Sequence, residues 1–96
     1  MIAVTLILQA KPGTADAMAQ FWAQAAQQVL KEDPGCRLLH AQRDASDPHR
    51  FIVFEIYGSQ AELDRHNQSE LSKQLMPGLM ELLAGPPQVM SGELVV

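Results

Sequence analysis

The chain has little cysteine, no cluster of positive charge and no long apolar run. Each of these absences argues against a class of protein. Its one cysteine, Cys36, excludes an intrachain disulfide and fits a reducing compartment, so we expect a cytoplasmic protein. Seven Lys and Arg residues are scattered among eleven acidic ones, giving a net charge of −4. Because no basic stripe could neutralise phosphates, nucleic acid is not an expected partner.

Membrane and cofactor signals are equally scarce. The apolar N-terminal run is only about eight residues long, far below the ~20 of a membrane span, and it has no basic flank or cleavage site. It therefore predicts a strand, and no membrane partner is expected. The sequence has no HExxH, CxxC, GxGxxG or P-loop, and His40, His49 and His66 lack a recognisable metal-ligand spacing. We expect no metal and no other cofactor.

Ninety-six residues predict one domain, residues 1–96. Hydrophobic periodicity predicts, in order, a strand over 2–10, a helix over 14–33, strands over 36–43 and 50–57, helical segments from 59 to about 84, and a strand over 89–96. The second helical region should bend near Ser69 and kink or restart at Pro77. The order β-α-β-β-α-β is typical of an α+β, ferredoxin-like fold with a four-stranded antiparallel sheet and helices on one face.

Local signals add detail to these elements. Thr14 is placed as an N-cap, and Ser59 with Glu62 forms a capping-box sequence. The short turn-rich segment 44–49 predicts a hairpin; if that hairpin pairs Arg43 with Arg50, then Glu55 shares a face with Leu38 and Tyr57.

The strands over 2–10 and 50–57 are apolar on both faces, but the helices can cover only one face of the sheet. An exposed apolar face of that size indicates a partner, and a two-fold homodimer that stacks sheet on sheet would cover it. We therefore expect a homodimer.

The chain carries an ordered set of short motifs: Pro34-Gly35-Cys36, Arg43-Asp44, Asp47-Pro48-His49-Arg50-Phe51, Phe54-Glu55-Ile56-Tyr57, Leu63 and His66. Together these motifs resemble the antibiotic biosynthesis monooxygenase (ABM) domain family over nearly the whole chain. The resemblance implies a dimeric α+β barrel with a substrate pocket between sheet and helices. Members of the family include cofactor-independent monooxygenases of anthrones and quinols, an isomerase of a signalling-sugar phosphate, and haem-degrading enzymes.

The chain also departs from the family pattern. Tyr57 stands where Trp is frequent, and Leu39 stands where Tyr is frequent. The Asn–Trp–His set of the haem-degrading members is not recognisable, because Leu6 occupies roughly the Asn position.

Three side chains are candidates for catalysis. Histidine is the side chain best suited to act as a general base near neutral pH, so His66 is a candidate for that role; the alternative is a partly exposed helix histidine bonded to a carbonyl. Tyr57 could donate a hydrogen bond to a substrate oxygen or be an ordinary strand aromatic. Glu55, in an apolar strand, must be paired, exposed or protonated, and a structural ion pair with an arginine or across the dimer is the alternative to catalysis.

The expected walls of a substrate pocket are apolar: Val4, Leu6, Trp22, Phe51 and Val53, although a tryptophan in such a helical stripe is more often a core residue. The same residues allow three functions. The first is a cofactor-independent monooxygenase of a small quinol- or anthrone-like substrate. The second is an isomerase that uses His66 for proton transfer, and the third is a non-catalytic dimeric barrel that binds a small ligand or responds to stress.

Overall fold

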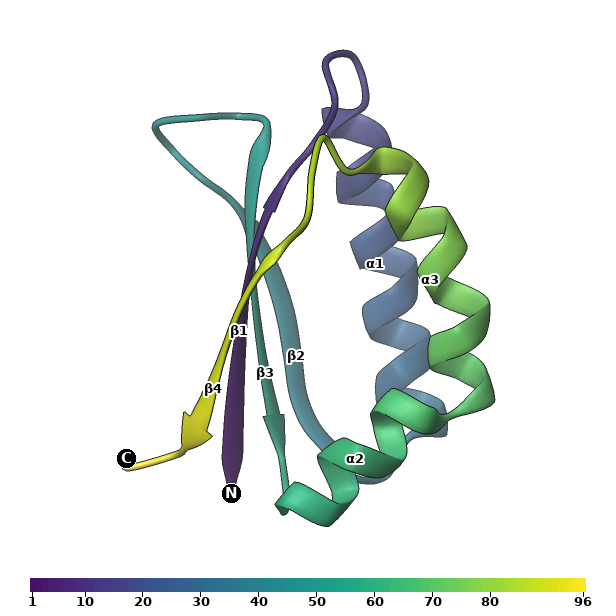
Figure 1. Ribbon diagram of the computed structural model, residues 1–96, viewed down its shortest axis with the longest axis vertical. Helices are drawn as coiled ribbons and strands as arrows, with labels where there is room; N and C mark the ends of the chain where they lie inside the picture. Colours follow the sequence, from purple (N-terminus) through teal and green to yellow (C-terminus); the bar gives the residue numbers. More distant parts are fainter.

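Four strands form one antiparallel sheet, and three helices lie against one of its faces (Figure 1). The computed structural model describes all 96 residues. The elements are β1 (Ile2–Gln9), α1 (Ala15–Glu32), β2 (Cys36–Arg43), β3 (Arg50–Tyr57), α2 (Gln60–Gln68), α3 (Glu70–Leu82) and β4 (Gln88–Glu93), with strand order β2-β3-β1-β4. This arrangement confirms the predicted ferredoxin-like α+β fold.

The two most apolar strands, β1 and β3, occupy the centre of the sheet. Every second residue of β3 is buried, and these four side chains face the helices: Phe51, Val53, Glu55 and Tyr57. The three without a charge, Phe51, Val53 and Tyr57, belong to the same core as Leu8 of β1 and Met18 of α1. Because strand side chains alternate, one carboxylate is carried into an otherwise apolar layer.

Helix α1 buries one stripe of its surface, formed by Met18, Trp22, Ala25 and Val29 at three- and four-residue spacing. Thr14 occupies the N-cap position, but its side chain makes no cap bond. Its hydroxyl instead donates to the carbonyls of Lys11 and Leu82. The predicted capping role of this side chain is therefore wrong, since its φ of −111° and ψ of 5° depart from the extended conformation of a capping residue.

The β2–β3 hairpin is antiparallel as predicted, but its register differs by one residue. Arg43 lies opposite Phe51, not Arg50, and Glu55 lies opposite Leu39. The loop closes instead through Arg50, whose guanidinium lies 2.6 Å from the Asp44 carboxylate. This register avoids placing two arginines opposite each other, which would be destabilising. Leu39, and not Leu38, thus shares the face of Glu55.

The second helical region breaks at Ser69, as predicted, but Pro77 does not restart it, because α3 continues from Glu70 to Leu82. Pro77 lies on the exposed side of α3. The carbonyl that loses its partner, that of Lys73, is on the same solvent-facing side and can bond to water, so the interruption is tolerated. None of the helices combines the length and apolarity needed to cross a membrane.

Ser69 joins α2 to α3 through two hydrogen bonds. Its hydroxyl accepts the Ser72 N–H at 3.1 Å and donates to the His66 carbonyl at 2.7 Å. Ser69→Ala should lower the free energy of unfolding by about 1 kcal/mol, measured by urea denaturation, because an N-cap is lost. Ser69→Gly should cost only a few tenths of a kcal/mol. Equal losses in the two variants would contradict this role.

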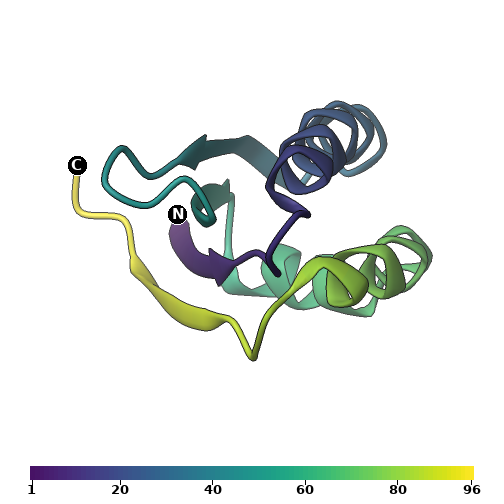
Figure 2. The ribbon, with the colours of Figure 1, turned by 90° about the horizontal axis from the view of Figure 1, so that it is seen from above.

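The sheet face away from the helices remains apolar. Ile52, Phe54 and Ile56 of β3 alternate with the buried residues and are half-buried. Leu38 of β2 and Met90 of β4 are 37% and 51% exposed. The C-terminal segment also lies on the side away from the helices (Figure 2). This face is the surface through which the sequence predicts a homodimer, and the dimer remains a prediction.

Candidate functional site

A cavity of about 240 Å³ lies between the sheet and the helices, and most of its wall is apolar. Val4, Leu6 and Trp22, three of the predicted wall residues, line it. Phe51 and Val53 do not: Phe51 borders a second hollow beside Arg43, and Val53 is fully buried in the core. Both belong to the correct sheet face, but other side chains cover them.

The polar residues of this cavity are Glu55, His66, Asn67, Ser72 and Ser91. They come from β3, α2, α3 and β4, with Asn67 following His66 directly. Two of them, Glu55 and His66, have side chains that can gain or lose a proton. The cavity therefore combines an apolar wall with one carboxyl group and one imidazole.

His66 is held by Asp33, which lies just after α1. The His66 Nδ1 and Asp33 Oδ2 atoms are 2.7 Å apart, and both side chains are about 15% exposed. The other Asp33 oxygen, Oδ1, accepts the Gly35 N–H at 3.0 Å. A carboxylate beside Nδ1 favours the tautomer with the proton on Nδ1. The basic lone pair is then on Nε2, the nitrogen left free for a ligand.

Asp33 was not predicted as a site residue. Its local surroundings indicate only a helix end: its N–H donates to the Val29 carbonyl, and Pro34 and Gly35 follow. The aspartate two residues before the Gly35 N–H is a recognisable turn signal. Nothing in the sequence relates it to a histidine 33 positions later.

Helix α2 reaches Asp33 because a glycine, Gly35, stands in the turn directly before β2. A Cβ atom on Gly35 would lie 2.9 Å from the Glu62 Cβ, too close for an ordinary contact. Ser59 caps α2 by accepting the Glu62 N–H at 3.2 Å, as predicted. The Glu62 carboxylate does not complete the capping box; one of its oxygens lies 3.8 Å from the Arg37 guanidinium.

Glu55 and Tyr57 form a buried pair in which the Tyr57 hydroxyl donates to Glu55 Oε1. Burial raises the pKa of Glu55, although the Tyr57 hydrogen bond and the nearby His66 oppose that rise. Burial, followed by the charge of Glu55, raises the pKa of Tyr57. Within the chain Glu55 forms no ion pair with an arginine, because its hydrogen-bond partner is a phenol, so that alternative is wrong. An ion pair across a dimer stays a prediction.

Tyr57 is close to His66 but does not line the cavity. The ring centroids are 5.0 Å apart, and the tyrosine is fully buried. Its hydroxyl already donates to Glu55, so in this structure Tyr57 supports Glu55 and does not present a donor to the cavity. In this structure the Tyr57 hydroxyl therefore cannot donate the predicted hydrogen bond to a substrate oxygen.

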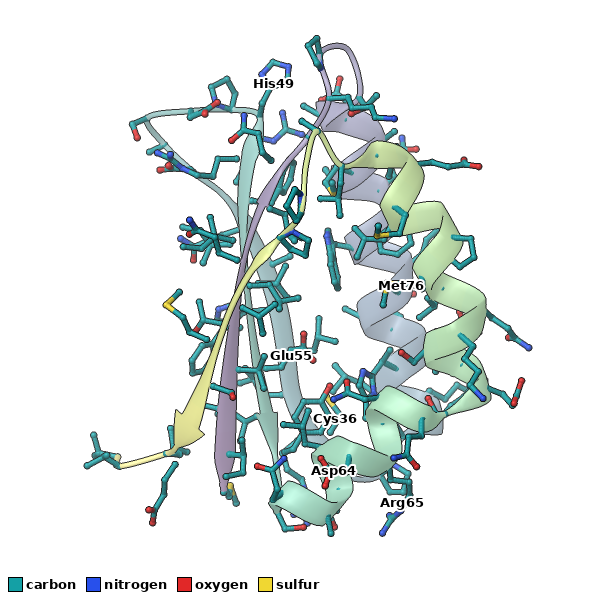
Figure 3. All side chains as sticks on the ribbon, viewed as in Figure 1. Cys36, His49, Glu55, Asp64, Arg65 and Met76 are labelled. Carbon is teal, nitrogen blue, oxygen red and sulfur yellow. The ribbon has the colours of Figure 1, made fainter.

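Cys36 is buried near this pair, and its pKa is raised to about 11, chiefly by burial and then by the charge of Glu55. A thiol with so high a pKa is a weak nucleophile at neutral pH, which agrees with the predicted role of a small buried hydrophobe. Figure 3 shows Glu55 and Cys36 between the sheet and the helices, whereas His49 lies at the opposite end of the molecule.

The sheet, the helices on one of its faces and a cavity between them define a small α+β protein of ferredoxin-like fold with an imidazole in the cavity wall. The antibiotic biosynthesis monooxygenase family model matches residues 1–77, and the chain belongs to that family. No protein of curated function matches it.

Solved structures share the fold over the whole chain. A Caulobacter crescentus protein that bears the family's name is 23% identical with a TM-score of 0.91, covering 99% of this chain and 90% of that one. A Nitrosomonas europaea protein of unknown function is 28% identical with a TM-score of 0.85, covering 99% and 89%. A Mycobacterium tuberculosis protein is 22% identical with a TM-score of 0.86, covering 99% and 95%.

Proposed function

We propose that this chain is a cofactor-independent monooxygenase of the ABM type that acts on a small aromatic, quinol- or anthrone-like substrate. The observation that carries the proposal is His66, which lines an apolar cavity and is held by Asp33. Family membership supports a monooxygenase-type or small-ligand-binding function. The cavity is smaller than the usual range of about 300–1,000 Å³ for ligand sites, which favours a small substrate.

His66 is the proposed general base. With Nδ1–H donating to Asp33, the Nε2 lone pair removes a proton from a phenolic hydroxyl or from an activated ring CH₂. Asp33 stabilises the imidazolium that forms. The substrate anion is electron-rich, and apolar walls keep water away from it.

The anion then reacts with O₂, the oxidant of the proposed reaction. For a CH₂ substrate, one electron passes to O₂, and combination of the two radicals forms the C–O bond of a peroxide. The imidazolium protonates the peroxide; loss of the second C–H proton breaks the O–O bond and leaves a ketone and water. Overall, CH₂ and O₂ give C=O and H₂O, so the organic substrate supplies all the electrons.

Oxygen consumption tests this proposal directly. Protein treated with a chelator and given no flavin should consume O₂ with members of a hydroquinone and anthrone panel, and the product should contain ¹⁸O from labelled O₂. If no member supports O₂ uptake, the monooxygenase proposal is wrong. Proton exchange without O₂ uptake would favour the isomerase, and binding without either reaction would favour a ligand-binding protein.

Asp33→Asn provides a second prediction. The amide nearly preserves the shape of the carboxylate but neither holds Nδ1–H as strongly nor stabilises an imidazolium. Turnover should fall about 10- to 100-fold with little change in KM, comparable to the loss of the outer partner of a metal-bound histidine. In a His66→Ala background the same substitution should have almost no further effect on turnover. A full additional loss there would show that Asp33 does not act through His66.

A further inference from the structure

Glu55 has one carboxyl oxygen that the protein leaves without a hydrogen-bond partner. The residue lines the cavity although it is only 6% exposed. Oε1 accepts the Tyr57 hydroxyl, and no other side chain or backbone group bonds to the carboxyl group. Oε2 is thus available to whatever fills the cavity.

The groups around Glu55 offer it no permanent positive charge. Tyr57 approaches from β3, Cys36 from the beginning of β2, and His66 from α2, with Asp33 bonded to His66. Tyr57 and Cys36 hold their protons, and Asp33 adds negative charge to the same region. An ionised carboxylate at a buried position without a cation is costly. Burial accordingly raises the pKa of Glu55 and favours its neutral form.

A neutral carboxylic acid can do what a carboxylate cannot, which is to donate a hydrogen bond. Because Oε1 accepts from Tyr57, the acid proton belongs on Oε2. The Tyr57 hydrogen bond also polarises the carboxyl group and makes its hydroxyl a better donor. The Tyr57 hydroxyl does not reach the cavity, so the Glu55 carboxyl group in the cavity wall is the group that can donate a hydrogen bond to a ligand.

We infer that Glu55 binds the ligand as a neutral acid, with Oε2–H donating to a carbonyl or phenolate oxygen, and that this contact makes Glu55 a specificity-determining residue. The cavity then selects aromatic ligands with two functions: an acidic proton near His66 and an acceptor oxygen at Glu55. The aromatic class rests on the proposed function, whereas the acceptor contact is testable by binding alone.

The test compares two ligands of the same skeleton, 1-tetralone and tetralin, which differ by a single ketone oxygen. Binding is measured by NMR titration at fixed pH. Wild type, Glu55→Gln and Tyr57→Phe should bind 1-tetralone within about threefold of each other, since each retains a donor at residue 55. The double variant Glu55→Met, Tyr57→Phe removes the donor at residue 55, and its second substitution avoids leaving the Tyr57 hydroxyl buried without a partner. It should bind 1-tetralone about tenfold more weakly than Tyr57→Phe alone. Tetralin affinity should be the same in all four proteins.

The pH dependence of 1-tetralone affinity distinguishes a hydrogen-bond donor at residue 55 from a side chain that only lines the cavity. Wild-type affinity for 1-tetralone should fall as rising pH removes the Glu55 proton, while Glu55→Gln, which retains His66, should show no such fall. Three results would overturn the inference. The first is a double variant that loses affinity equally for 1-tetralone and tetralin, and the second is the same pH dependence of binding in wild type and Glu55→Gln. The third is a wild-type protein that does not bind 1-tetralone. Oxygen consumption with quinols is measured on the unmodified protein, so failure of the monooxygenase proposal is seen separately.

Discussion

His66→Ala should lower turnover of an accepted quinol or anthrone by about 10²–10⁴-fold, the usual loss when a general base is removed. KM should change much less, because the apolar wall that binds the ring remains. The measurement is the rate of O₂ consumption at saturating substrate and at a temperature well below the midpoint of unfolding.

The structure also revises what this substitution should do to stability. From the sequence alone, a polar helix residue contributes little, but His66 bonds to Asp33 at 2.7 Å in a largely buried position. We expect a loss of about 1–2 kcal/mol in the free energy of unfolding, since Asp33 keeps only its Gly35 partner. His49→Ala is the matched control, because His49 lies at the far end of the molecule (Figure 3) and should leave turnover unchanged. Unchanged turnover in His66→Ala would exclude His66 as the base.

Phe54→Lys should convert a dimer into a monomer. The wild-type protein is expected to sediment at about twice 10.6 kDa, because the open sheet face carries Ile52, Phe54 and Ile56 without helices to cover them. A lysine in the centre of that face would bury a charge without a partner in each subunit, at a cost of several kcal/mol. Sedimentation at micromolar concentration should then give about 10.6 kDa.

The control for this change adds the same charge on the opposite side of the molecule. Gln24 lies on the exposed side of α1, so Gln24→Lys should leave the sedimenting mass at the wild-type value. A wild-type chain that remains monomeric and well folded at micromolar concentration would rule out the sheet-face dimer. A monomeric Phe54→Lys variant that still turns over substrate would show that the cavity of one subunit is sufficient.

Much of the fold follows from local patterns in the sequence. A run of β-branched and aromatic residues predicted β3, three- and four-residue spacing predicted the buried stripe of α1, and Ser69 marked the break between α2 and α3. These patterns are reliable because strand and helix periods determine which side chains share a face. The hairpin register was predicted wrongly, and the Asp44–Arg50 ion pair closes the loop in the observed register. Of the two outcomes predicted at Pro77, a kink or a restart, the restart is wrong, because α3 continues to Leu82.

The candidate site also has some features that local sequence patterns predict and others that only tertiary contacts determine. The sequence by itself identified His66 as a possible base and placed Glu55 in an apolar strand, because both conclusions need only residue type and local pattern. Only the tertiary structure paired His66 with Asp33 and Glu55 with Tyr57, and it placed Phe51 and Val53 outside the cavity. The reason is physical: hydrogen bonds form over about 3 Å, and packing of α2 over Gly35, not sequence separation, brings His66 within that distance of Asp33. Glu55 and Tyr57 lie two residues apart on the buried face of β3, where burial beside each other pairs the carboxyl group with the phenol.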